Sequence, residues 1–176
     1  MCVATTLKGT SGYAFVGRGG TADINYIVGN INTNGSFDTT FFTTGVRTGS
    51  IDDTDNLFRG VLRSELNGRQ FVAGGYSWIN GNWTYTLAAF LTNGLLDTTF
   101  NTIGYRHTAL SANESGALAI DTQTDGGAPL YRHFPVAAGP VKNSDWDFGL
   151  ARYTTDGLLD TGFSTDGMIS RYSFLI

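Results

Sequence analysis

The phrase "NGSFDTTF" occupies residues 34–41, "NGLLDTTF" occupies 93–100 and "DGLLDTGF" occupies 156–163. The copies lie about sixty residues apart, so the chain is built from three repeats of that length. Asn-Gly or Asp-Gly at the head of each copy is typical of a tight turn, because Gly tolerates positive φ and Asn or Asp bonds its own nearby backbone. The phrase therefore marks the same corner in three units.

The residues of the phrase have separate structural roles. Its second half predicts another tight turn, in which an Asp accepts backbone N–H groups and the final Phe is buried in the core. Calcium binding by these carboxylates is the alternative, but an ion loop brings several carboxylates together at close spacing. We therefore assign structural turn roles to Gly35, Gly94, Gly157, Asp38, Asp97 and Asp160, and we expect Phe41, Phe100 and Phe163 to be buried equivalents.

Each repeat contains four strand-like runs in a fixed order, joined as a meander. The first runs are 2–12, 58–68 and 116–126, and the second are 13–20, 70–77 and 133–140. The third runs, 24–33, 83–92 and 146–155, precede the phrase, and the weaker fourth runs, 44–51, 103–110 and 166–173, follow it. We expect one repeat domain, 1–176, with units of about 1–51, 52–110 and 111–176.

The third run of the second repeat is apolar on both faces. Tyr85, Leu87, Ala89 and Leu91 lie on one side, and Thr86, Ala88 and Phe90 on the other. Such a strand must be covered twice, as in sheets stacked around an axis. The sequence therefore predicts an all-β fold with almost no helix, a β-propeller of three four-stranded blades. A single-chain threefold β-prism or β-trefoil is the alternative, although trefoil repeats are generally shorter.

The segment "DWDFGLARYTTDGLLDTGFSTDGMIS" (145–170) resembles the delta-60 repeat, a β-propeller repeat of bacterial proteins. The third repeat matches almost throughout, the second matches well and the first less well. The chain departs from the usual wording where Asn101 and Ser164 follow the phrase in place of Gly. The resemblance implies a propeller, often in an extracellular setting, and no catalytic residues.

Composition narrows the classes of partner. The net charge is −4 and only 11 Lys and Arg are scattered along the chain, so we expect no nucleic-acid partner. The apolar runs are too short to cross a bilayer, so we expect no membrane partner. The lone Cys2 excludes an internal disulfide or a cysteine metal cluster, and we expect no metal and no cofactor. The start of the chain lacks the pattern of a secretory signal and leaves the compartment open.

The aromatic segment 76–85 is the best candidate for a ligand-binding surface. With Asn80 and Gly81 as a two-residue turn, Trp78 faces Trp83 and Tyr76 faces Tyr85 across a hairpin. We add Trp146 and Tyr131, which lie in or beside the proline-bearing segment of the third repeat, where a loop differs from its counterparts. These rings can stack on a sugar, or they can simply stabilise the hairpin or a subunit contact.

Two classes of function follow. The first is a non-enzymatic binding or assembly module that presents aromatic loops to a glycan or a protein. The second is a glycan-active hydrolase or lyase that uses Asp145, Asp147, His107 or His133, since paired carboxylates serve glycoside hydrolysis. Convergence of these four side chains in one pocket would favour the enzyme.

Three blades are too few to close a propeller, because propellers typically have about four to eight. We therefore expect a homo-oligomer, most simply a homodimer whose two halves form a six-bladed ring. The segment 167–176 is expected to be a spare strand that is exchanged between the two chains.

Overall fold

The computed structural model describes residues 2–7, 11–20, 23–52, 54–64, 68–125 and 132–171. Twelve strands and no helix lie in these residues. The described part consequently offers no helix of the length and apolarity that a membrane crossing requires. The all-β prediction is confirmed.

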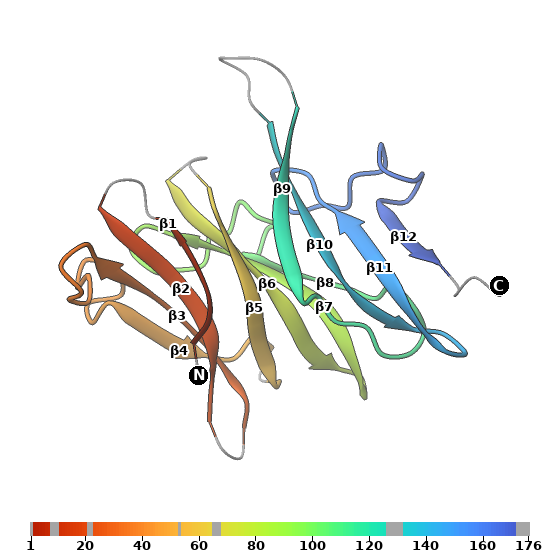
Figure 1. Cartoon of the computed structure of the whole chain (residues 1–176), viewed down its shortest axis with the longest axis horizontal. Coiled ribbons are helices and arrows are strands. Elements are labelled where there is room, and N and C mark those ends of the chain that lie inside the picture. Colours follow the sequence, from red (N-terminus) through yellow and green to blue (C-terminus); the bar gives the residue numbers. More distant parts are fainter. Residues whose placement is uncertain are drawn as a thin grey trace.

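The strands form three four-stranded antiparallel sheets, which we call blades 1, 2 and 3 (Figure 1). Blade 1 holds β1 (Cys2–Leu7), β2 (Gly12–Gly19), β3 (Asn25–Asn32) and β4 (Val46–Gly49). Blade 2 holds β5 (Asn56–Arg63), β6 (Arg69–Ile79), β7 (Asn82–Leu91) and β8 (Tyr105–Thr108). Blade 3 holds β9 (Ala119–Asp125), β10 (Arg132–Lys142), β11 (Trp146–Arg152) and β12 (Met168–Arg171). Strand order follows chain order, so each blade is the predicted meander.

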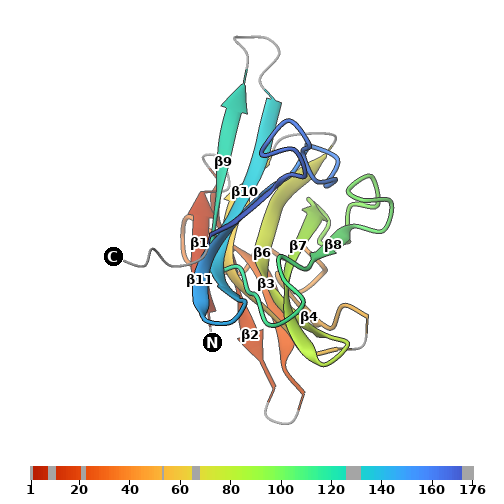
Figure 2. The same cartoon turned by 90° about the vertical axis from the view of Figure 1, so that its right-hand side faces the viewer.

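The blades stack face to face with blade 2 in the middle (Figures 1 and 2). Their first strands lie together, because β1 contacts β5 and β5 contacts β9. Four-stranded meanders that share an inner edge in this way are the blades of a β-propeller. Blades 1 and 3 make no extensive contact with each other among the described residues, so the three blades form an open arc.

Hydrophobic side chains fill both spaces between blades. On β7, Ala88 and Phe90 pack in the cluster shared with blade 1, whereas Tyr85, Leu87 and Ala89 pack in the cluster shared with blade 3. This alternation confirms that the strand is covered on both faces. Burying one large apolar side chain contributes roughly 1.5–3 kcal/mol, so stacking rather than strand pairing alone holds the arc together.

The repeated phrase folds in the same way in all three blades. One carboxylate oxygen of its Asp accepts a backbone N–H from two residues downstream, at 3.0 Å in each copy: Thr40 to Asp38, Thr99 to Asp97 and Gly162 to Asp160. The backbone N–H of the final Phe donates to the carbonyl of the same Asp in each copy. The three similar copies of the phrase therefore make the same backbone hydrogen bonds.

The final Phe of the phrase packs against the following blade. Phe41 and Phe100 are fully buried. The ring of Phe41 stacks on Phe71 of blade 2, with 5.8 Å between ring centroids, and Phe100 lies against Gly157 of blade 3. Phe163 is only partly buried, so the prediction of three buried equivalents is wrong for this residue. The reason is that no described blade follows blade 3.

The fourth strand of blade 3 also differs from expectation. Met168–Arg171 pairs with β11 of its own sheet as β12, and blade 1 already has four strands of its own. The prediction that this segment is a spare strand exchanged between chains is therefore wrong for these residues. The remaining residues of that segment, 172–176, lie outside the described part.

Candidate functional site

The aromatic hairpin forms as the sequence predicts. Asn80 and Gly81 both have positive φ, 50° and 84°, as a two-residue hairpin turn requires. Across the β6–β7 ladder, Trp78 pairs with Trp83 and Tyr76 pairs with Tyr85. The ring of Trp83 meets Trp78 edge to face at 5.2 Å and Tyr76 at 5.1 Å between centroids. These contacts lie in the favourable range for aromatic pairs and fix the orientation of the hairpin rings.

A pocket of about 190 Å³ opens beside this hairpin, where blade 2 meets blade 3. We call it the aromatic pocket, and it is lined by Tyr76, Trp83, Glu114, Ser115, Gly116, Leu118, Pro140 and Trp146. The structure thus brings together three of the five predicted ligand-binding residues. Trp78 stands directly behind Trp83 with an exposed ring, and Tyr131 lies outside the described residues.

The walls of the aromatic pocket are held by contacts behind the rings. The guanidinium of Arg59 donates to the Tyr76 hydroxyl at 3.1 Å, and Gly116 lies against the Tyr76 ring so closely that a Cβ there would approach it to 3.0 Å. The connector from blade 2 to blade 3 is tied down by the backbone N–H of Ser115, which donates to the Trp83 carbonyl at 2.7 Å. The pocket is therefore a preformed feature of the blade 2–blade 3 joint.

The polar groups of the aromatic pocket are few. Glu114 contributes a carboxylate, and the buried Ser115 hydroxyl has no hydrogen-bond partner among the described residues. The Lys142 ammonium lies over the Trp146 ring, 5.5 Å from its centroid. Aromatic faces with one carboxylate suit a ligand that is flat and apolar on its faces and carries hydroxyl groups at its edge. Glu114 and Ser115 were not predicted as site residues, because they lie between two repeated runs, 103–110 and 116–126.

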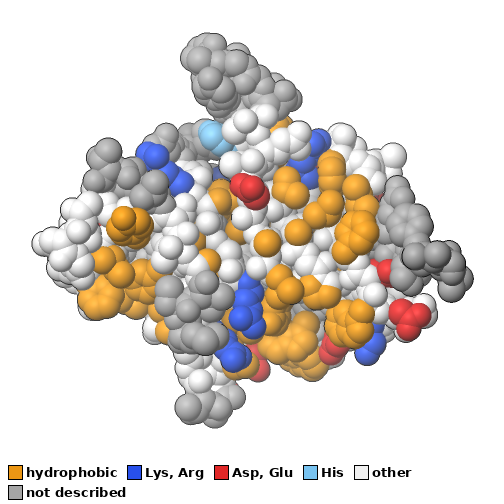
Figure 3. All heavy atoms as spheres, viewed as in Figure 1, with side chains coloured by type: hydrophobic (Ala, Val, Ile, Leu, Met, Phe, Trp, Pro, Cys, Tyr) orange, Lys and Arg blue, Asp and Glu red, His pale blue; other side chains and the backbone are white. Residues whose placement is uncertain are grey.

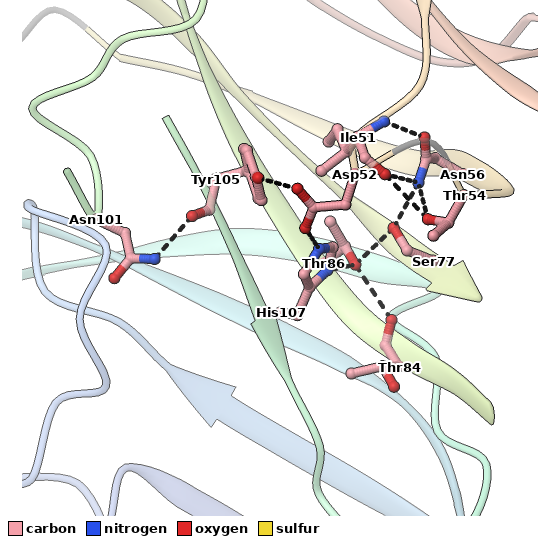
Figure 4. Close-up of polar contacts among 10 residues, drawn as sticks. All are labelled: Ile51, Asp52, Thr54, Asn56, Ser77, Thr84, Thr86, Asn101, Tyr105 and His107. Atoms are coloured by element: carbon pink, nitrogen blue, oxygen red, sulfur yellow. Dashed lines mark hydrogen bonds and ion pairs between the residues drawn. The ribbon is translucent and has the colours of Figure 1, made fainter. Parts of the chain in front are cut away.

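His107 belongs to a separate polar network on blade 2 (Figure 4). Its Nε2 lies 3.1 Å from the Asp52 carboxylate and its Nδ1 lies 2.8 Å from the Thr86 hydroxyl, which in turn contacts Ser77. Tyr105 also donates to Asp52. Burial lowers the pKa of His107 below its ordinary value despite the Asp52 carboxylate, so a neutral imidazole stands in this network at neutral pH.

The acid–imidazole–hydroxyl order of this network matches that of a nucleophilic triad, but its placement does not. Thr86 is completely buried between the blades, so its hydroxyl cannot meet a substrate. The network instead joins Asp52, which precedes β5, to β6, β7 and β8. We therefore interpret it as a clamp that fixes the connector between blades 1 and 2.

The four residues of the enzyme hypothesis do not converge. His107 is in the clamp, and His133 pairs with Thr124 at one end of β10. Asp147 pairs with Val141 at the other end of β10, roughly 25 Å away at about 3.3 Å per residue, and Asp145 lies beside it in the hairpin. None of the described pockets holds two of them. The described residues also contain no group of three or more His, Cys, Asp or Glu that could hold a metal ion.

Comparison with known proteins supports the architecture. Residues 67–100 and 136–163 match the family model described as "Domain of unknown function (DUF5122) beta-propeller". These segments cover β6, β7 and the phrase in blade 2, and most of β10, all of β11 and the phrase in blade 3. No curated protein and no solved structure matches the chain. The second and third repeats of this chain are therefore similar to the DUF5122 β-propeller model over these two segments.

Proposed function

We propose that the chain is a non-enzymatic β-propeller binding module that takes one sugar ring of a glycan in the aromatic pocket. The observation that carries the proposal is the convergence of Tyr76, Trp83 and Trp146 with the Glu114 carboxylate in one preformed pocket. Pyranose rings present C–H groups on their faces, which stack on aromatic rings, and hydroxyl groups at their edges, which bond to carboxylates and hydroxyls.

A protein ligand was the alternative that the sequence left open. Peptide recognition uses an exposed sheet edge or an extended groove that takes several side chains in succession. The aromatic pocket has about 190 Å³, below the range of about 300–1,000 Å³ for drug-sized ligands, and this volume suits a single ring better. Its size therefore favours a sugar residue over a peptide segment.

The tryptophans make the proposal directly testable. The chain has 3 Trp, and all of them, Trp78, Trp83 and Trp146, line the aromatic pocket or touch a residue that does. Intrinsic tryptophan fluorescence therefore reports on this site alone. Titration with a panel of mono- and oligosaccharides should give a saturable change in intensity or emission maximum for at least one sugar.

A matched pair of variants separates binding from folding. Trp146 and Leu95 are both exposed, so neither Trp146→Ala nor Leu95→Ala should unfold the protein. Calorimetric titration with the responding sugar should show about tenfold weaker affinity for Trp146→Ala and unchanged affinity for Leu95→Ala, because one stacked ring is worth roughly 1 kcal/mol or more. If no sugar alters the fluorescence, or if Trp146→Ala binds as well as the unaltered protein, the proposal is wrong.

A further inference from the structure

We propose that a second copy of this chain closes the propeller, with blade 3 of each copy packed on blade 1 of the other. Each blade has a leading face, turned toward the following blade, and a trailing face, turned toward the preceding one. No described blade covers the leading face of blade 3 or the trailing face of blade 1. The proposal is that these two faces meet as the internal faces do.

The two internal joints are built from the same positions of the repeat. Phe41 and Phe42 of blade 1 cover Gly94 of blade 2, where a Cβ would lie 2.9 Å from the Cβ of Phe42. Phe100 of blade 2 covers Gly157 of blade 3, where a Cβ would lie 2.7 Å from ring atoms of Phe100. In both joints, the first glycine of one phrase is thus covered by the end of the preceding phrase.

A backbone hydrogen bond accompanies this contact in both joints. The N–H of Phe42 donates to the carbonyl of Asn93 at 3.0 Å, and the N–H of Asn101 donates to the carbonyl of Asp156 at 2.6 Å. The acceptor in each case is the first residue of the following phrase. The joint is therefore defined by one buried Phe, one glycine and one backbone bond.

Both halves of a third joint are present, and neither makes this contact among the residues that the structure describes. Phe163 ends the phrase of blade 3 and is only partly buried, and Ser164 follows it. Gly35 heads the phrase of blade 1, is exposed, and has no atom within 4 Å of where its Cβ would lie. Phe163 of one copy therefore matches Gly35 of the other, and the Ser164 N–H matches the Asn34 carbonyl.

The open faces carry the apolar side chains that internal joints bury. Tyr26, Tyr85 and Phe148 stand at the same position before the phrase; Tyr26 is 1% exposed, Tyr85 0% and Phe148 52%. On the trailing side, Tyr13 is 48% exposed, whereas its counterpart Phe71 in blade 2 is 0% exposed. Figure 3 shows hydrophobic side chains gathered over the strands of blade 3. Exposed apolar surface of this kind marks an interaction site.

Blade number and symmetry favour two copies. Two arcs of three blades give six, within the range of about four to eight that propellers adopt. A twofold axis along the centre of the ring makes both new joints identical and leaves no face open, so the assembly stops at two chains.

The first test uses two matched substitutions, each measured by light scattering. Phe148 and Leu158 are equally exposed in the single chain, 52% and 51%, so Phe148→Glu and Leu158→Glu cost the fold about the same. Leu95, the counterpart of Leu158 in blade 2, stays 49% exposed although that blade is packed on both faces, so this position lies outside the joint. We expect the unaltered chain and Leu158→Glu to have the mass of two chains and Phe148→Glu that of one.

The second test asks which faces meet. Tyr13→Glu blocks the trailing face of blade 1, as Phe148→Glu blocks the leading face of blade 3, and each variant alone should be a folded monomer by circular dichroism and light scattering. Mixed in equal amounts, they should form a one-to-one dimer, because each supplies the face that the other lacks. Failure of the mixture to associate contradicts the head-to-tail joint. A mass of one chain for the unaltered protein contradicts the proposal altogether. The two open faces would then bind something other than a second copy, such as another blade.

Discussion

The two residues that follow each phrase adopt positive φ in every blade. They are Phe42 and Thr43, Asn101 and Thr102, and Ser164 and Thr165, with φ between 48° and 62°. Non-glycine residues rarely adopt this region, and a β-branched Thr there is strained. The usual Phe-Gly wording of the delta-60 repeat places Gly at the first of these positions, so the departure of this sequence from that wording carries a backbone cost.

Thr165→Gly should therefore stabilise the protein. Left-handed backbone costs roughly 1–2 kcal/mol for a residue with a Cβ, which exceeds the entropy that Gly loses on folding, so we expect a gain of about 0.5–1 kcal/mol in the free energy of unfolding. Thr161, also exposed and in the same loop, does not have positive φ. Urea denaturation should show a loss for Thr161→Gly, and a loss for both variants would contradict the strain argument.

The most buried ion pair among those described joins Asp97, in the phrase of blade 2, to Arg69, the first residue of β6. Arg69 Nε donates to the Asp97 carboxylate at 2.7 Å, both side chains are almost fully buried, and Arg69 also donates to the Thr155 carbonyl of blade 3 at 2.7 Å. Asp97→Asn leaves the guanidinium without its counter-ion, so we expect a loss of about 3 kcal/mol in urea denaturation. The double variant Arg69→Met/Asp97→Leu should recover part of the lost stability. If Asp97→Asn is as stable as the unaltered protein, the ion pair does not stabilise the fold.

The same carboxyl makes stability depend on acid. Burial alone would raise the pKa of Asp97, but hydrogen bonds from Thr99 and Arg69 and the charge of Arg69 lower it below its ordinary value of 3.8. The unfolded chain then binds the proton more readily, so the stabilisation is complete above the unfolded pKa and is lost as pH falls through the folded pKa. The unaltered protein should lose stability steeply below about pH 4, and the slope should be smaller for Asp97→Asn.

At the scale of elements, the phrase is a joint between blades. Phe100 is buried between blades 2 and 3 with the Arg69 guanidinium over its ring, so Phe100→Ala should cost about 3–5 kcal/mol in the free energy of unfolding. Leu95→Ala in the same phrase should change it by less than about 0.5 kcal/mol, because Leu95 is exposed. A loss below about 1 kcal/mol for Phe100→Ala would show that the phrase does not hold the blades together.

Strands and turns could be predicted because their signals are local. The four runs of each repeat, the Asn80-Gly81 hairpin and the two-faced β7 follow from turn chemistry and side-chain alternation over a few residues. The threefold repetition of these signals then fixed the architecture as stacked meanders. The spare-strand prediction was wrong because it used the fourth run of the third repeat twice: that run completes blade 3 as β12, and run 2–12 already gives blade 1 its first strand.

The site could be predicted only where it lies on a repeated strand. Tyr76, Trp83 and Trp146 stand on hairpins, whereas Glu114 and Ser115 lie on a connector whose position depends on how blade 3 docks on blade 2. The clamp around His107 joins Asp52 to Thr86, residues distant in sequence, and no local pattern pairs them. Polar partners that are distant in sequence come together only when the blades pack, and no local pattern in a single sequence indicates which residues will meet.

At the scale of the whole molecule, the central claim is that the same contact links each blade to the next. Two of these contacts lie within the chain, and we propose that the third forms between two chains. In a single chain the Ser164 N–H has no hydrogen bond among the described residues, whereas the equivalent N–H groups of Phe42 and Asn101 are bonded to the following blade. Hydrogen exchange followed by NMR compares these three amides directly, because exchange requires the bond to open.

We expect the Ser164 amide to be protected to a degree similar to that of Phe42 and Asn101 in concentrated protein, and to lose its protection on dilution or in Phe148→Glu while the other two keep theirs. If Ser164 exchanges at the rate of an unprotected amide under conditions in which Phe42 and Asn101 are protected, the third joint does not form and the closed ring is wrong.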